Sequence, residues 1–244
     1  MNPKISIITV CYNSAAHVEQ AIQSVVSQPY ENKEYIVIDG GSTDGTLDII
    51  AKYHNQIDYF VSEPDRGISD AFNKGIKVAT GDIIGICNSD DFMMPNVLSR
   101  IADEYDEVTD IYRGYCIVWN KKTGKKHTLH PNTRFSIPPF GAIICHESSF
   151  ISKRLYQKIG LYKTNFKYMM DLDLFIRIYK DKTVRTKFVD VCVITFCTGG
   201  VSSSSFSQLK EERKRLILEN GGNWCDVVVY LTYHRIKAIL KRFY

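Results

Sequence analysis

Two adjacent carboxylates, Asp90 and Asp91, follow the short apolar run of residues 83–87 after Asn88 and Ser89. The run is apolar throughout and too short for a helix, which predicts a buried strand. A strand that ends in two carboxylates places negative charge at the carboxyl edge of a sheet, where open α/β folds bind ligands. Such oxygen ligands suit a hard divalent cation, Mn²⁺ or Mg²⁺, shared with a substrate phosphate. For this acid pair taken alone, an ordinary aspartate-stabilised turn is the alternative.

A third acid, Asp39, ends a second apolar run at residues 35–38 and is followed by the turn-forming segment 40–46, GGSTDGT. The tip of the second strand of a parallel sheet is where such folds hold the ribose or base of a nucleotide. Asp39 could equally cap the next helix, and the residues alone do not separate these two roles.

A fourth acid, Asp171, lies in the segment 168–178, whose apolar residues have helical spacing. The helix is predicted to begin near Asp171, where a carboxylate also complements the helix dipole, so a capping role is the alternative to a chemical one. Asp173 faces another side of the helix and is predicted to pair with Arg177, four positions further on.

Alternating strands and helices are predicted to carry these residues. The predicted strands are residues 5–10, 35–38, 59–61, 83–87, 110–119, 142–145 and 189–197, and the predicted helices are 15–27, 47–53, 68–78, 97–105, 171–178, 208–220 and 224–244. The alternation in the first hundred residues predicts an α/β fold with a mostly parallel central sheet flanked by helices. Residues 131–140 are predicted to be irregular, and the lysine-rich segment 121–126 is predicted to be a solvated hairpin turn rather than a nucleic-acid patch.

The composition is that of an ordinary globular protein: 244 residues, 44% hydrophobic and 24% charged. A net charge of +4 gives no reason to expect nucleic acid as a partner. The seven cysteines form no C-x-x-C pair and mostly lie in apolar runs, which indicates buried thiols in a reducing cytoplasm. No signal peptide or membrane-spanning run is visible, so a cytoplasmic location is expected.

Four segments resemble one protein family. They are residues 7–13, IITVCYN; residues 37–46, VIDGGSTDGT; residues 62–75, SEPDRGISDAFNKG; and residues 88–91, NSDD, with Pro95 shortly after. In this order the sequence is similar to family 2 glycosyltransferases of the GT-A fold, in the branch that builds bacterial surface polysaccharides. The resemblance implies an inverting enzyme that uses a nucleotide-sugar donor, with uridine as the expected base.

The resemblance also implies which residues surround the donor. They are Thr9, Cys11, Tyr12, Asn13, Asp39, Asp70, Asn88 and Ser89. It places a divalent metal, Mn²⁺ or Mg²⁺, at Asp90, with Asp91 sharing the ligation. The family motif here is D-x-D, so Asn88 replaces its first aspartate and brings no charge, which predicts weaker metal binding. Gly199, Gly200 and Ser202 resemble a loop near the donor diphosphate, for which a plain turn is the alternative.

On the acceptor side, Asp171 matches the family's general base. His146 also matches the family, whereas Glu147 replaces its usual glutamine and Met170 replaces its usual glutamate. A structural hydrogen-bonding role is the alternative for His146. The expected acceptor is a hydroxyl group of a glycan, in particular a lipid-linked oligosaccharide.

Two other functions stay open. A sugar nucleotidyltransferase is disfavoured, because no glycine-rich, Lys/Arg-bearing triphosphate loop follows the first strand. A catalytically inactive nucleotide-sugar-binding or scaffold protein is kept open by Asn88 and Met170. A GT-A domain is expected over residues 1–205, with a donor half (1–95) and an acceptor half (96–205). The helical extension 206–244 is expected to bind a membrane surface through residues 223–244, to pack on the domain, or to contact a second subunit.

Overall fold

The computed structural model of the protein describes residues 2–131, 146–198, 206–230 and 232. The described strands form one sheet in the order β3-β2-β1-β4-β8-β6-β9-β5, with β7 paired to β6. The strands are β1 (Ile5–Cys11), β2 (Lys33–Asp39), β3 (Tyr59–Ser62), β4 (Ile83–Ile86), β5 (Phe92–Met93), β6 (Ile111–Asn120), β7 (Lys126–Leu129), β8 (Ser149–Ser152) and β9 (Thr186–Thr198). The helices are α1 (Val18–Val26), α2 (Thr46–Ala51), α3 (Ile68–Val78), α4 (Val97–Asp103), α5 (Lys153–Ile159), α6 (Met170–Lys180) and α7 (Phe206–Glu219), with short 3₁₀ turns at His54–Gln56 and His146–Ser148.

The α/β fold is confirmed, and the parallel pairing is concentrated in the N-terminal half. There β3, β2, β1 and β4 are all parallel. The C-terminal half is mixed: β8 is antiparallel to both β4 and β6, β6 is parallel to β9, and β5 and β7 are antiparallel to their partners. Only the N-terminal half therefore has the parallel order that the alternation predicts.

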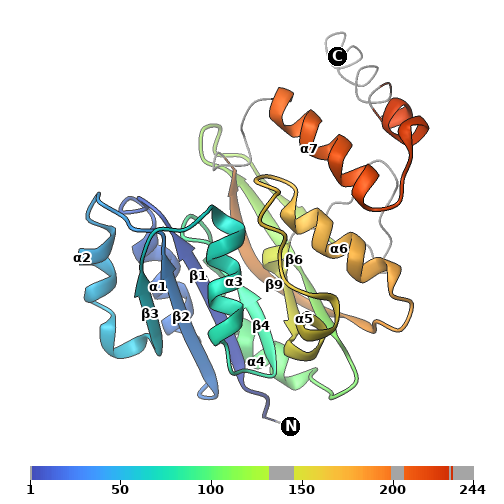
Figure 1. The fold of residues 1–244 in the computed structure, drawn as a ribbon. Helices are drawn as coiled ribbons and strands as arrows, with labels where there is room; N and C mark the ends of the chain where they lie inside the picture. Colours follow the sequence, from blue (N-terminus) through green and yellow to red (C-terminus); the bar gives the residue numbers. More distant parts are fainter. Residues whose placement is uncertain (1, 132–145, 199–205, 231, 233–244) are drawn as a thin grey trace.

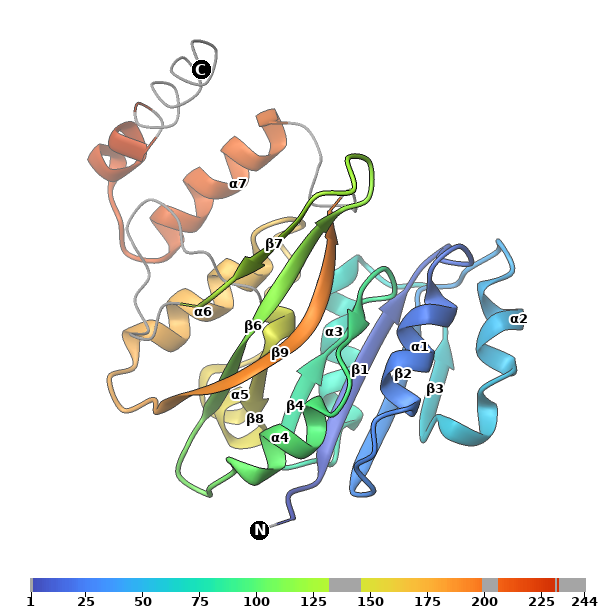
Figure 2. The same cartoon turned by 180° about the vertical axis from the view of Figure 1, so that it is seen from behind.

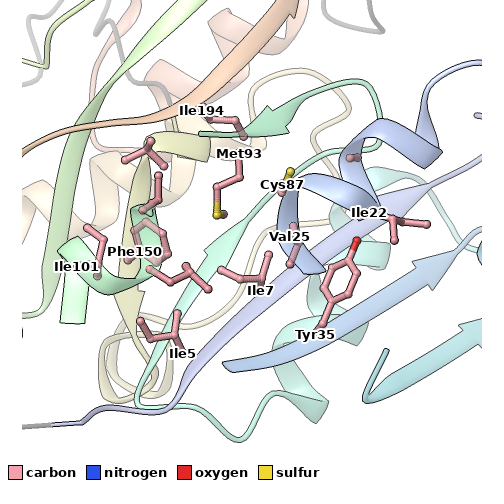
Figure 3. Close-up of a cluster of buried hydrophobic side chains, with 14 of the residues drawn as sticks. Ile5, Ile7, Ile22, Val25, Tyr35, Cys87, Met93, Ile101, Phe150 and Ile194 are labelled. Atoms are coloured by element: carbon pink, nitrogen blue, oxygen red, sulfur yellow. The ribbon is translucent and has the colours of Figure 1, made fainter. Parts of the chain in front are cut away.

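Helices cover both faces of the sheet. Figure 1 shows α3, α5 and α6 on the near face, and Figure 2, seen from behind, shows α1 and α4 on the other. Successive residues of a strand point to opposite faces. Accordingly, Ile7 packs in the cluster with α1 and α4 that Figure 3 shows, whereas Ile8 packs against α3 and α6. The buried residues of β1 thus contribute to two cores.

Helix α3 approaches β1 closely at Gly75. A Cβ atom at this position would lie 2.6 Å from Cγ2 of Ile8. We expect Gly75→Ala to lower the free energy of unfolding by about 1–2 kcal/mol, because overpacking outweighs the better helix propensity of alanine. Urea denaturation measures this, with the exposed Lys77→Ala on the same helix as the control. A Gly75→Ala variant as stable as the parent would contradict the close packing.

The cysteines follow the prediction in the described part of the chain. Cys11, Cys87, Cys116 and Cys197 are buried, Cys192 is half-buried and Cys225 is exposed. Cys145 and the predicted strand 142–145 lie outside the described residues, as does most of the irregular segment 131–140. Among the helices of the described chain, none combines the length and the apolar character needed to cross a bilayer.

Candidate active site

The carboxyl ends of β1, β2 and β4 meet at one edge of the sheet, and hydrogen bonds join the loops that follow them. The side chain of Asn13 accepts a hydrogen bond from the backbone N–H of Thr43 (2.9 Å), and the N–H of Asn13 donates to the hydroxyl of Ser42 (2.8 Å). The hydroxyls of Ser14 and Ser89 lie 2.9 Å apart. Three of the four resembling segments, separated in sequence, are therefore brought together here.

Asp39 organises the loop after β2 and is fully buried. Its carboxylate accepts hydrogen bonds from the N–H groups of Gly41 and Ser42 (both 2.9 Å), and from the hydroxyl of Ser62 (2.7 Å). Burial raises the pKa of Asp39, but these hydrogen bonds outweigh burial and leave the pKa below its usual value. Asp39 is thus an ionised side chain whose observed partners are all in the protein.

Two other predicted donor-binding residues of β1 point into the protein. Thr9 is fully buried, and its hydroxyl accepts a hydrogen bond from the phenol of Tyr35 (3.0 Å). The thiol of Cys11 is buried 3.5 Å from Asp39, and burial raises the pKa of that thiol. These side chains support the edge from below rather than present atoms at its surface.

Tyr12 is the exposed aromatic side chain at this edge, with 64% of its surface accessible. Gly40 lies beneath it: a Cβ at Gly40 would be 3.4 Å from the Tyr12 ring and 2.5 Å from a carboxylate oxygen of Asp65. Asp70, in the first turn of α3, accepts hydrogen bonds from the N–H (3.1 Å) and guanidinium (3.3 Å) of Arg66. The edge thus combines an aromatic face with carboxylates.

Asn88 joins two buried carboxylates after β4. Its amide nitrogen donates to Glu147 (2.9 Å) and more weakly to Asp91 (3.3 Å), which are 6% and 1% exposed. The other oxygen of Asp91 accepts the backbone N–H of Cys197 in β9 (2.8 Å). Asp91 is thereby anchored between β4 and β9, while Asp90 beside it is partly exposed.

The region around Asp90 and Asp91 carries excess negative charge. Burial raises the pKa of both, the charge of Glu147 raises both further, and Asp90 does the same to Asp91. Lys121 and His17 supply the opposing positive charge near Asp90. The side-chain oxygen of Asn88 is buried without a hydrogen-bond partner in the described part of the chain. This donor set fits a hard divalent cation.

The described residues do not by themselves complete a metal site, because no group of three or more His, Cys, Asp or Glu side chains among them has a ligating arrangement. Mg²⁺ characteristically binds through one or two carboxylates together with substrate phosphates. Asp90 and Asp91 supply the one or two carboxylates that such a site needs.

Asp171 lies in the first turn of α6, as predicted, and near His146 of the 3₁₀ turn. The Nδ1 atom of His146 is 3.9 Å from Asp171 and 3.4 Å from Glu147. The side chain of Asp171 is 28% exposed, and one of its oxygens accepts the N–H of Leu172 (2.7 Å). Burial raises the pKa of Asp171, which the positive charge of His146 partly opposes. A raised pKa makes the Asp171 carboxylate a stronger proton acceptor than an ordinary aspartate.

The predicted residues of the two sides are linked through Glu147, which contacts Asn88 with one carboxylate oxygen and faces His146 with the other. Met170 is 8% exposed and packs in the core on the α6 side. Asp173 is fully buried and pairs with Arg177 (2.8 Å), as predicted. Gly199, Gly200 and Ser202 lie outside the described residues.

Two contributors to this site were missed by sequence reasoning. The turn after β6, predicted to be merely solvated, brings Lys121 near Asp90, and β9 supplies the N–H of Cys197. The alternating pattern of β9 predicts a strand but not which element lies beside that strand. Neither contact could therefore be predicted from the sequence.

Comparison with known sequences gives a consistent result. The family model of Glycosyl transferase family 2 matches residues 6–209. An uncharacterized glycosyltransferase of Rickettsia typhi is 30% identical over 195 residues, which cover 75% of this chain and 61% of that protein. The chain thus spans about three fifths of that relative's length. A PGL/p-HBAD biosynthesis glycosyltransferase of Mycobacterium bovis BCG is 29% identical over 223 residues, covering 88% of this chain and 84% of that protein.

Solved structures share the fold at lower sequence identity. A fragment of S. aureus TarS in complex with UDP-GlcNAc superposes with a TM-score of 0.70 at 19% identity, covering 95% of this chain and 72% of that one. The mannosyltransferase PcManGT of Pyrobaculum calidifontis, in complex with GDP-Man and Mn²⁺, has a TM-score of 0.63 at 19% identity, covering 90% and 63%. With the family match spanning most of its length, the chain belongs to glycosyl transferase family 2.

Proposed function

We propose that this chain transfers a sugar from a nucleotide-sugar donor to a hydroxyl group of a glycan acceptor, with inversion at the anomeric carbon. One observation carries the proposal: two carboxylates in separate surroundings, Asp90 at the strand edge and Asp171 on α6, both lie near Glu147, which accepts a hydrogen bond from Asn88 and faces His146 beside Asp171. Separate carboxylates allow one to serve the leaving group and the other to serve the nucleophile.

The donor is held at the edge formed by β1, β2 and β4. The exposed ring of Tyr12 offers a face on which a base can stack, and Gly40 leaves room below it. The complexes of TarS with UDP and UDP-GlcNAc support a uridine nucleotide, since that protein has the same fold. The sugar of the donor is selected by contacts in its own pocket, and a protein only 19% identical does not identify them.

The base and the cation-binding carboxylates have distinct tasks. The Asp171 carboxylate accepts the proton of the acceptor hydroxyl as the hydroxyl oxygen attacks the anomeric carbon. His146 lies 3.9 Å from that carboxylate, and when the imidazole is protonated it favours the ionised form of Asp171. Asp90 and Asp91 are the residues that would hold a divalent cation, and such a cation would supply positive charge to offset the charge on the leaving nucleoside diphosphate. A single displacement of this kind inverts the configuration.

The proposed acceptor is lipid-linked, in assembly of a surface polysaccharide or glycolipid. Support comes from the relatives named for PGL/p-HBAD biosynthesis. It also comes from the exposed side chains of Trp224, Val228 and Val229 in the last described helical segment. Co-sedimentation with anionic vesicles tests the membrane contact: Trp224→Ala should reduce binding several-fold, and no binding by the parent would refute it.

The function is tested by nucleoside diphosphate release from a panel of UDP- and GDP-sugars, with and without Mn²⁺. Turnover of one donor that requires the cation supports the proposal and identifies the sugar. Binding of a donor without turnover under any condition, with or without candidate acceptors, would favour the inactive binding protein instead. Release of pyrophosphate from a nucleoside triphosphate and a sugar phosphate would indicate a nucleotidyltransferase.

The pH dependence follows from the raised pKa of Asp171. Below that pKa the carboxyl group is protonated and cannot accept a proton, so the transfer rate should fall about tenfold per pH unit on the acid side. An imidazole that is protonated favours ionised Asp171, and glutamine cannot carry that charge, so for His146→Gln we expect the acid limb to move to higher pH. A pH–rate profile of both proteins measures the shift. An acid limb that moves to lower pH, or stays, would separate His146 from the base.

A further inference from the structure

Glu212 of α7 binds the backbone immediately ahead of α6. Its carboxylate accepts three hydrogen bonds from backbone N–H groups: Lys167 at 2.7 Å, Tyr168 at 2.8 Å and Met169 at 3.1 Å. These residues lead directly into α6, whose second residue is Asp171. One side chain of α7, a helix distant in sequence, therefore holds the three residues that precede α6. Helix α6 carries the proposed base.

This contact supplies what the helix lacks locally. The first N–H groups of a helix have no partner within it, and a capping side chain usually satisfies one of them. The N-cap residue of α6 is Met169, whose side chain makes no such hydrogen bond. The carboxylate of Glu212 binds the N–H of this N-cap residue and those of the two residues before it, and its negative charge also complements the helix dipole.

A second attachment joins the same two helices beyond Asp171. Asp173 is fully buried, and its carboxylate receives Lys163 (3.0 Å) and the side-chain amide of Asn220, just past the end of α7 (3.2 Å). Leu216 of α7 is 2% exposed and packs in the core cluster that includes Leu174. Figure 1 shows α7 lying alongside α6. The backbone is thus fixed to α7 on both sides of Asp171.

We propose that Glu212 is a positioning residue for the base: it sets the backbone from which Asp171 reaches toward His146. The inference rests on the proposed function for its catalytic consequence. Glu212 lies beyond residue 209, where the family match ends, in the segment that sequence alone assigns to a separate extension. Base geometry in this chain therefore depends on a residue outside the matched family region.

The test compares Glu212→Gln with Glu211→Gln. Glu211 is its neighbour, 69% exposed and paired only loosely with Lys214 (3.8 Å), so it controls for the loss of one charge from α7. Glutamine keeps the size of Glu212 but offers one acceptor oxygen, and its NH₂ group opposes the remaining N–H donors. Glu212→Asp keeps the charge and is the conservative variant.

Three measurements are made on the full chain. Glu212→Gln should lower kcat for nucleoside diphosphate release at least tenfold. The dissociation constant for UDP should stay unchanged within about twofold, because the proposed nucleotide site is the sheet edge formed by β1, β2 and β4. Glu212→Asp should recover part of kcat, and Glu211→Gln should match the parent. In an Asp171→Asn background, Glu212→Gln should cause no further loss, because both changes act through the same carboxylate.

Backbone amide hydrogen exchange separates the anchor from the function. Faster exchange at residues 167–171 in Glu212→Gln, but not in Glu211→Gln, supports the anchor even if no donor is turned over and the proposed function fails. Unchanged exchange there overturns the inference. So does an equal loss of kcat in the Asp171→Asn background, or a matching loss of UDP affinity and melting temperature, because each of these outcomes indicates general destabilisation.

Discussion

Replacing Asp171 by asparagine is expected to lower the rate of sugar transfer by about 10²–10⁴-fold, the usual contribution of a general base. Asparagine keeps the shape of the side chain, and its oxygen can still accept the N–H of Leu172. It cannot take a proton from an acceptor hydroxyl. The nucleotide edge is formed by other elements, so affinity for the nucleoside diphosphate should change by no more than about twofold. Steady-state kinetics and calorimetric titration with UDP measure the two quantities.

Asp173 offers a contrast on the same helix. It is fully buried and paired with Arg177 and Lys163, so Asp173→Asn breaks a buried ion pair and should destabilise the protein by about 3–5 kcal/mol. Asp171 has a raised pKa, and losing its charge should leave the melting temperature unchanged or slightly higher. A fully active Asp171→Asn, or one that melts as early as Asp173→Asn, would refute the assignment of the base.

Local patterns were sufficient for the N-terminal half of the fold. The helix predicted over residues 68–78 is α3 to the residue, because its apolar spacing and its bounding glycine signals are all local. Neighbouring helices are shorter than predicted: α1 begins at Val18 instead of residue 15 and α4 ends at Asp103 instead of residue 105. Each βα unit there pairs strands that follow one another, so sequence order nearly determines position.

The C-terminal half depends on contacts that sequence order does not indicate. Strand β8 was missed because its sequence, SFIS, is short and half serine, yet Ser149 and Ser152 are buried between β4 and β6. Strand β5 has only two residues and exists through its pairing with β9. Helix α5 was also missed. Burial by distant partners, rather than intrinsic pattern, forms these elements.

The sequence predicted where the residues of the candidate site lie in the fold, but not which of them contact one another. Strand ends correctly indicated where Asp39, Asp90 and Asn88 would lie, because parallel strands share a carboxyl edge. Thr9 was predicted to surround the donor, but side chains alternate along β1 and that of Thr9 turns inward to Tyr35. The hydrogen bond from Asn88 to Glu147 spans 59 positions and could not be read from either motif.

That hydrogen bond supports the second prediction with a large effect. Asn88→Asp would place a third carboxylate between Glu147 and Asp91, both of which are almost inaccessible to solvent. Two hydrogen bonds donated by the amide would be lost and a negative charge would be added beside Glu147, a cost of about 2–3 kcal/mol for groups that lose a partner in a buried site. We therefore expect cation-dependent nucleoside diphosphate release to fall about 30–100-fold.

Glu147→Gln is the designed suppressor of this defect. Alone it should be mild, because glutamine can still accept the hydrogen bond from Asn88. Combined with Asn88→Asp, its amide donates to the new carboxylate, so the double variant should recover at least tenfold over Asn88→Asp, which a double-mutant cycle would measure as coupling. Recovery should be partial, because Asp91 still faces position 88. The exposed Asn96→Asp controls for added charge.

The outcome bears on whether the departures from the family pattern indicate an inactive protein. The family resemblance has an aspartate where Asn88 stands and a glutamine where Glu147 stands. The structure places these two side chains 2.9 Å apart. If the resemblance holds at both positions, the carboxylate and the amide have exchanged sides of this hydrogen bond, and the negative charge stays at the site. If the double variant recovers, the two departures are one compensated change in an active enzyme. If it is no better than Asn88→Asp alone, the departures are independent, and the inactive nucleotide-sugar-binding protein becomes the stronger hypothesis.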